Sequence, residues 1–149
     1  MRVRAAAAHL RRRSNLAFAS FGMTTDQYVL LTVLAEEGKA TQQELVTQCF
    51  SDTATIGAMV ALLETKGLVK RTPHPRDRRA LSVSLTRSGR RLAKQMRTSS
   101  AAVRADLMRL FSEQELATLL EFLGRLAGAM RPPPRRAGIL SKRQRSRDG

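Results

Sequence analysis

The sequence predicts a mainly α-helical protein with a small antiparallel β-hairpin wing: a winged helix-turn-helix with long N- and C-terminal helices. Polar capping sequences mark the starts of several helices. Apolar residues recur about every 3.6 residues, as in helices, except between residues 68 and 85, where they recur every two residues, as in strands. A formal net charge of +15 over 149 residues indicates a polyanionic partner, with nucleic acid the first candidate.

Helices are expected wherever apolar residues recur at helical spacing, and most of them begin at a recognisable cap. Thr24 and Gln27 form a capping box, in which the threonine hydroxyl accepts from the backbone three residues on and the glutamine side chain reaches back. Thr41 and Ser112 begin equivalent sequences, and Asp52 is expected to cap a fourth helix. The expected helices span residues 5–20, 25–37, 42–48, 53–66, 87–110 and 113–130.

The wing is predicted from a change of period. In residues 80–85 three apolar residues alternate with two serines, which is typical of a half-buried strand. Residues 68–72 are the expected partner strand. Pro73 and Pro75 follow, and because proline cannot donate to a β-ladder, residues 73–77 are expected to form a turn outside both strands. The residues expected on the buried face of the second strand are Leu81, Val83 and Leu85.

Several classes of function are not expected from the composition. The single cysteine, Cys49, excludes an intrachain disulfide, and with His9 far from His74 no metal site or cofactor is expected. No apolar run approaches the roughly 18 residues of a membrane span, so no membrane partner is expected and the cytoplasm is the default location. No nucleophile–base pair or glycine-rich phosphate loop is recognisable, so the chain is not expected to be an enzyme.

The two central helices and the hairpin indicate DNA binding. Residues 42–48 and 53–66 are joined by a short turn and followed by a basic hairpin. An α-helix fits the major groove of duplex DNA, where its N-terminal residues reach base edges and phosphates. The hairpin carries Arg76, Arg78 and Arg79, which can reach the flanking backbone or the minor groove, where negative potential attracts guanidinium groups.

Spaced motifs in this region resemble the MarR family of transcriptional regulators (multiple-antibiotic-resistance regulators). Residues 23–28, 41–45 and 63–69 resemble segments of the family's helix-turn-helix region. Asp77-Arg78-Arg79 and Leu85-Thr86-Arg87-Ser88-Gly89, separated by five residues, fit the family's wing signature, D-x-R followed by L-T-x-x-G. Several motifs in the right order cover about half the chain, which makes the resemblance specific.

The resemblance implies a homodimer in which the first, fifth and sixth helices of both chains interlock. Its partner is double-stranded DNA, with the fourth helix in the major groove and the wing at the flanking minor groove. It further implies a repressor that binds a (pseudo)palindromic operator and is released by a small anionic or phenolic effector. The expected regulator domain is residues 1–131, with a DNA-binding core over 24–86, dimerisation helices over 1–23 and 87–131, and a basic disordered tail over 132–149.

The candidate DNA contacts come from the third helix, the fourth helix and the wing. On the fourth helix, Gly57 and Ala58 occupy positions where relatives often present polar or arginine side chains, so more of the specificity is expected to rest on DNA shape and the wing. His74 stands where relatives often have aspartate. Asp77 is expected to pair with an arginine and fix the shape of the wing. The full candidate set is Gln42, Gln43, Thr53, Thr55, Gly57, Ala58, Arg71, His74, Arg76, Arg78 and Arg79.

Three alternatives stay open. Gly57, Ala58 and the basic tail favour a weakly sequence-specific architectural DNA-binding protein, whereas the wing signature favours a specific regulator. Gln42 and Gln43 either cap the third helix, contact phosphate or are solvated. Cys49 is expected to be a core residue rather than a redox sensor, and the chain has no second cysteine to resolve a sulfenate.

Overall fold

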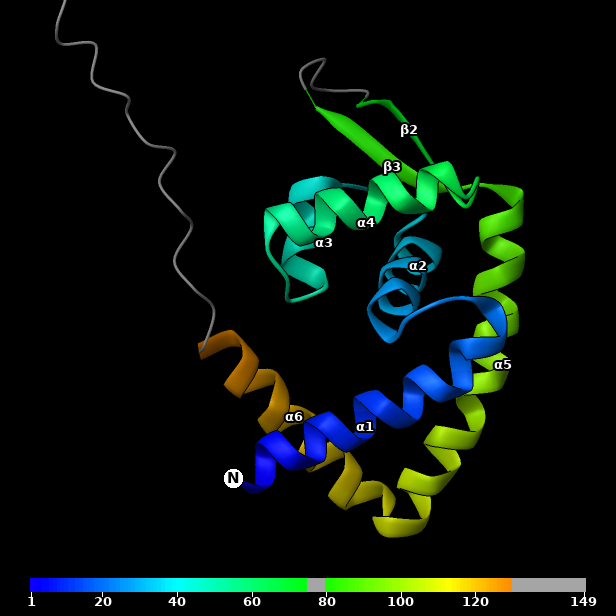
Figure 1. Ribbon diagram of the computed structural model, residues 1–149. Coiled ribbons are helices and arrows are strands. Elements are labelled where there is room, and N and C mark those ends of the chain that lie inside the picture. The colour runs from blue at the N-terminus through cyan, green and yellow to red at the C-terminus, as the bar shows by residue number, and fades with distance from the viewer. Residues whose placement is uncertain (75–79, 130–149) are drawn as a thin grey trace, which may run out of the picture.

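The computed structural model describes residues 1–74 and 80–129, which form a mainly helical fold with one antiparallel sheet (Figure 1). The expected fold class is confirmed. The elements in chain order are α1 (Arg2–Phe18), the 3-10 helix η1 (Ala19–Phe21), α2 (Thr25–Glu37), β1 (Lys39–Thr41), α3 (Gln42–Gln48), α4 (Thr53–Thr65), β2 (Val69–Pro73), β3 (Leu81–Leu85), α5 (Arg87–Leu110) and α6 (Glu113–Ala129).

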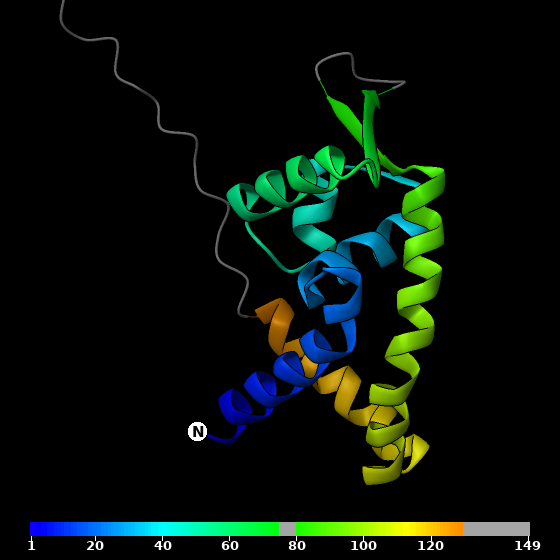
Figure 2. The same cartoon turned by 45° about the vertical axis from the view of Figure 1, so that its right-hand side comes forward.

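The long helix α5 connects two ends of the molecule. In both views, α4 and the strands β2 and β3 lie at one end of α5, whereas α1 and α6 lie at the other (Figures 1 and 2). Helix α2 lies between the two ends and packs on α5, where the Tyr28 hydroxyl is 3.3 Å from Ser100 Oγ. The helix-turn-helix and the wing therefore lie at the same end of α5.

The core is built from one face of α4 and the apolar residues of α2. The buried residues of α4 recur at helical intervals, as is typical of a helix with one apolar face. Burying each such side chain contributes about 1.5–3 kcal/mol. Phe18, the last residue of α1, is buried in this core, and its ring centroid lies 4.6 Å from that of Tyr28. The fully buried residues of the two helices are Leu30, Leu31, Leu34, Ile56, Val60 and Leu63.

The predicted helix caps are present. Thr24 Oγ1 accepts from the Gln27 backbone N–H at 3.3 Å, while Gln27 Oε1 accepts from the Thr24 N–H at 3.0 Å. Thr41 forms the same box with Glu44. Asp52 Oδ1 accepts from a backbone N–H in the first turn of α4 at 2.9 Å. These bonds satisfy N–H groups that a helix start otherwise leaves unpaired.

The prediction that Pro73 lies outside the strands is wrong. Pro73 is the last residue of β2 and pairs with Leu81 of β3. The strand order β1-β3-β2 makes β2 an edge strand, where a missing N–H costs no ladder bond. The third strand, β1, was not predicted, because three residues between a helix end and the Thr41 cap are too few to show a period of two.

The predicted alternation of buried residues fails at the start of β3. Leu81 is 52% exposed and Ser82 is buried, whereas Val83 and Leu85 are buried as expected. Leu81 lies at the wing end of the strand, paired only with Pro73 of β2, so no helix covers it. Ser82 is buried because β3 is the central strand, with both β1 and β2 paired beside it.

Within the two described ranges, no single helix is long and apolar enough to cross a membrane. Helices α3 and α4 meet that criterion only as a pair, and they are bent by 112°. The same ranges contain no group of three His, Cys, Asp or Glu residues placed to hold a metal ion.

Candidate nucleic-acid interface

The two helices of the helix-turn-helix are held together at Gly57. A Cβ built at Gly57 would lie 3.1 Å from Gln42 Nε2, so the glutamine side chain of α3 lies directly over the glycine of α4. The same Nε2 donates to the Thr53 carbonyl oxygen at 3.4 Å. This contact between the helices was not among the roles expected of Gln42, which were capping, phosphate contact or solvation. Gln43, its neighbour, is exposed on the surface of α3.

The start of α4 is organised by Asp52. Its carboxylate accepts from the Thr55 backbone N–H and, at 2.7 Å, from the Thr55 hydroxyl. These hydrogen bonds hold the pKa of Asp52 below its usual value. The hydroxyl of Thr55 is therefore engaged in the cap, whereas Thr53 at the same helix end is exposed.

The outward face of α4 consists of small and apolar side chains. Ala58 is exposed, and its neighbours on that face are also exposed. None of them is ionisable. The exposed residues of α4 are Thr53, Ala54, Thr55, Ala58, Ala61, Leu62 and Thr65.

Arg71, a predicted DNA contact, forms an ion pair across to α4. Its Nη1 lies 3.1 Å from Glu64 Oε2, and its backbone N–H donates to Glu64 Oε1 at 3.3 Å. The Arg71 side chain is 30% exposed. The pair fixes β2, and with it the base of the wing, against the C-terminal half of α4. No sequence pattern predicted this partner, because the two residues lie on different elements.

Of the wing, the structure describes the two strands together with His74 and Ala80 at their ends. The His74 backbone N–H donates to the Ala80 carbonyl at 3.0 Å, which extends the pairing of β2 with β3 by one step. Arg76, Asp77, Arg78 and Arg79 lie outside the described residues, as does the predicted tail over 132–149. Lys39 of β1 and Lys70 of β2 are exposed, and both pair with Ser84 of β3, so they lie on the same face of the sheet. Three further exposed cations lie at the start of α5: Arg87, Arg90 and Arg91.

The carboxylate of Glu44, in the first turn of α3, accepts two hydrogen bonds from Thr41. The Thr41 backbone and hydroxyl donate to Glu44 Oε2 at 2.7 and 2.9 Å. These bonds lower the pKa of Glu44, and the charge of His74 lowers it further. The α3 cap therefore lies near the base of the wing, a proximity that no local sequence pattern predicts.

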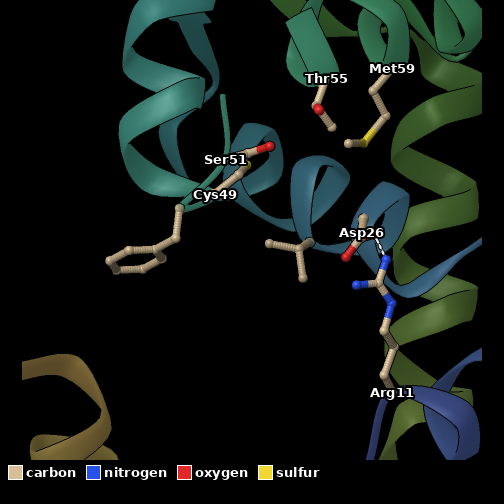
Figure 3. A pocket seen from close by; sticks show the side chains of 8 residues that line it. Arg11, Asp26, Cys49, Ser51, Thr55 and Met59 are labelled. Carbon is tan, nitrogen blue, oxygen red and sulfur yellow. Dashed lines mark hydrogen bonds and ion pairs between the residues drawn. The ribbon is translucent and has the colours of Figure 1, made fainter. Parts of the chain in front are cut away.

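A pocket of about 290 Å³ lies between α1, α2 and the start of α4 (Figure 3). Arg11 of α1 and Asp26 of α2 point toward one another at its edge and form an ion pair. Thr55 and Met59 of α4 line the opposite side. Cys49 also lines the pocket and is half-buried rather than fully buried; its burial raises the pKa of the thiol.

Exposed apolar side chains gather at the end of the molecule opposite the wing. Helix α6 has no buried residue, although its sequence is strongly amphipathic. Helix α1 has only one buried residue, Phe18. The exposed large apolar residues of these two helices include Val3, Leu10, Leu16, Leu120, Phe122, Leu123 and Leu126.

Comparison with known proteins places the chain among transcriptional regulators. The model of a family described as the MarR family matches residues 21–80, from the end of η1 to the residue before β3. The HTH-type transcriptional repressor NicR of Pseudomonas putida is 40% identical over 67 residues. That match covers 45% of this chain and 42% of NicR, so it spans less than half of the curated relative.

Solved structures extend the similarity over most of the chain. A probable transcriptional regulator from Pseudomonas aeruginosa is 31% identical, with a TM-score of 0.69 over 80% of this chain and 92% of that one. The transcriptional repressor CouR, solved bound to a 23-mer DNA duplex, is 26% identical. Its TM-score is 0.75 over 84% of this chain and 89% of CouR.

Proposed function

This chain belongs to the MarR family of DNA-binding transcriptional regulators, and from that premise we propose that it is a homodimeric repressor of a pseudopalindromic operator. The observation that carries the proposal is the division of the molecule into two ends. A helix-turn-helix and a basic wing occupy one end of α5, and unpartnered apolar helix faces occupy the other. The family is one of regulators rather than enzymes.

The homodimer is supported by the faces of α1 and α6. A helix that is amphipathic yet has no buried residue needs a partner to cover its apolar stripe. A second copy of the chain supplies that partner, because a two-fold interface presents the same face twice. Two helix-turn-helix units related in this way read two half-sites of opposite orientation, which is what makes the operator pseudopalindromic.

Release by a small anionic or phenolic ligand is supported by the pocket beside Arg11. The pocket joins α1, at the dimer end, to α4, at the DNA end. A ligand carboxylate can replace Asp26 as the partner of the Arg11 guanidinium. Suppose that the distance between α1 and α4 differs between the DNA-bound and free conformations of the protein. A ligand that binds the free conformation more tightly then raises the population of that conformation and releases DNA.

A weakly specific architectural protein is the second candidate. It is favoured by the outward face of α4, which presents no ionisable side chain to the bases. Competition between specific and random DNA separates the two candidates, since only a repressor retains its site in excess random duplex.

The dimer is tested by sedimentation of the full chain and of Leu123→Glu, which places a charge on the exposed apolar stripe of α6. We expect a dimer for the wild-type chain and a folded monomer with much weaker DNA binding for the variant. Gln114→Glu adds the same charge at the first turn of α6 and should leave the dimer intact. A wild-type monomer that binds DNA normally would contradict the proposal.

A further inference from the structure

The outward face of α4 is an unbroken stripe of small side chains. Ala54, Ala58, Ala61 and Thr65 follow one another at intervals of four, three and four residues, and all four are exposed. They lie on the side of α4 opposite the buried residues. Leu62, which is 44% exposed, widens the stripe.

Three polar side chains next to this stripe are engaged within the described chain. The Thr55 hydroxyl donates to the Asp52 carboxylate, and Glu64 is paired with Arg71. At the far end of α4, Lys66 Nζ donates to the Gly22 carbonyl at 3.1 Å. The helix therefore offers the bases methyl groups rather than the arginine or amide forks that read guanine or adenine.

Thymine is the base whose major-groove edge carries an apolar group, the 5-methyl. Alanine and threonine methyls pack against it, and their small size lets the helix approach the base edges closely. Exposed cations lie on the elements around the helix-turn-helix, at Lys39 of β1, Lys70 of β2 and Arg87 of α5. They supply phosphate contacts that hold the helix in the groove without reading sequence.

We propose that α4 selects half-sites rich in A·T pairs by packing its alanine and threonine stripe against thymine 5-methyl groups. The inference rests on the proposed function, since it concerns the base class that a DNA-binding α4 reads. The sequence led us to expect that specificity rests on DNA shape and the wing. In this inference α4 reads the bases directly, through the methyl groups that are buried when it packs against thymine.

The test begins with selection from a randomised duplex library by the full chain, followed by synthesis of the selected site with deoxyuridine at single thymines. Deoxyuridine removes only the 5-methyl and leaves pairing intact. We expect A·T-rich half-sites and a loss of about fourfold in affinity for each half-site thymine replaced, because one buried methyl group contributes about 0.8 kcal/mol. Deoxyuridine in the flanks, outside the half-sites, is the matched control and should change little.

The protein side of the test uses Ala58→Ser, which replaces part of the apolar stripe by a hydroxyl. We expect it to bind the selected site more weakly and to be less sensitive to deoxyuridine. Ala35→Ser makes the same change at an exposed position of α2 and should behave as wild type.

Two results separate the inference from its premise. A selected site that tolerates deoxyuridine at every half-site thymine, or that presents G·C pairs there, overturns thymine readout while leaving a specific regulator. Selection that enriches no sequence at all overturns the proposed function itself.

Discussion

The amide of Gln42 covers the bare Cα of Gly57, with its Nε2 3.1 Å from the position that a Cβ would occupy. This contact sets how closely α3 approaches α4 at the turn of the helix-turn-helix. A glycine inside a helix normally costs about 0.5–1 kcal/mol relative to alanine. Here the cost is offset by the close approach of the two helices.

Gly57→Ala is expected to stabilise the fold by about 0.5 kcal/mol, since the helix gains propensity while a flexible amide end moves aside. In the Gln42→Ala background the gain should rise to about 1 kcal/mol, because no side chain then has to move. Urea unfolding of the two single variants and the double variant measures the coupling. Equal gains in both backgrounds would show that Gln42 does not restrict Gly57.

At Gly89, in contrast to Gly57, the backbone of a neighbouring segment excludes a side chain. A Cβ there would lie 2.0 Å from the Leu68 carbonyl oxygen, at the junction of α5 with the wing. Because backbone rather than a flexible side chain blocks the space, Gly89→Ala is expected to cost about 3 kcal/mol. Ser88→Ala, at the neighbouring exposed position of α5, is the control. A neutral Gly89→Ala in thermal unfolding would contradict the close packing.

The Thr41–Glu44 capping box predicts a pH dependence. The pKa of Glu44 is lowered in the fold, chiefly by the hydrogen bonds from Thr41, so the carboxylate stabilises the fold above its unfolded pKa and this contribution is lost as pH falls through the lower, folded value. Thr41→Ala is expected to cost about 1 kcal/mol at pH 7. The cost should shrink in acid. A cost that is unchanged between pH 7 and pH 3 would remove Glu44 from the cap.

Cys49 is expected to be a poor nucleophile. Burial raises the pKa of its thiol, so little thiolate is present at neutral pH. Iodoacetamide should label it more slowly than free cysteine, and peroxide should leave DNA binding unchanged. Release of DNA by peroxide that disappears in Cys49→Ser would instead establish a redox sensor.

The Arg11 pocket predicts which side chain responds to an anionic effector. Benzoate, as the simplest aromatic carboxylate, is expected to weaken DNA binding by the wild-type chain and to have little effect on Arg11→Gln. Neutral benzyl alcohol is the matched ligand control. Equal sensitivity of the two proteins to benzoate, followed by fluorescence anisotropy, would place the effector elsewhere.

The helices were predictable because each carries local signals, namely caps at Thr24, Thr41 and Ser112 and a buried period such as that of α4. Features that depend on tertiary contact were not. Strand β1 exists through its pairing with β3, and the Glu64–Arg71 pair joins residues whose partners no local pattern reveals. The helical spacing of α4 predicted its buried face, yet the chemistry of the opposite face emerged only when its exposure was known.

The central claim, a sequence-specific regulator, is tested most directly by fluorescence anisotropy of the full chain on its own upstream DNA against random duplex over a range of salt. The account predicts a preference on the order of 10³ or more, with saturation at one dimer per inverted repeat. Equal affinity for both duplexes with a steep salt dependence would contradict it, and would instead describe an electrostatic coat on DNA.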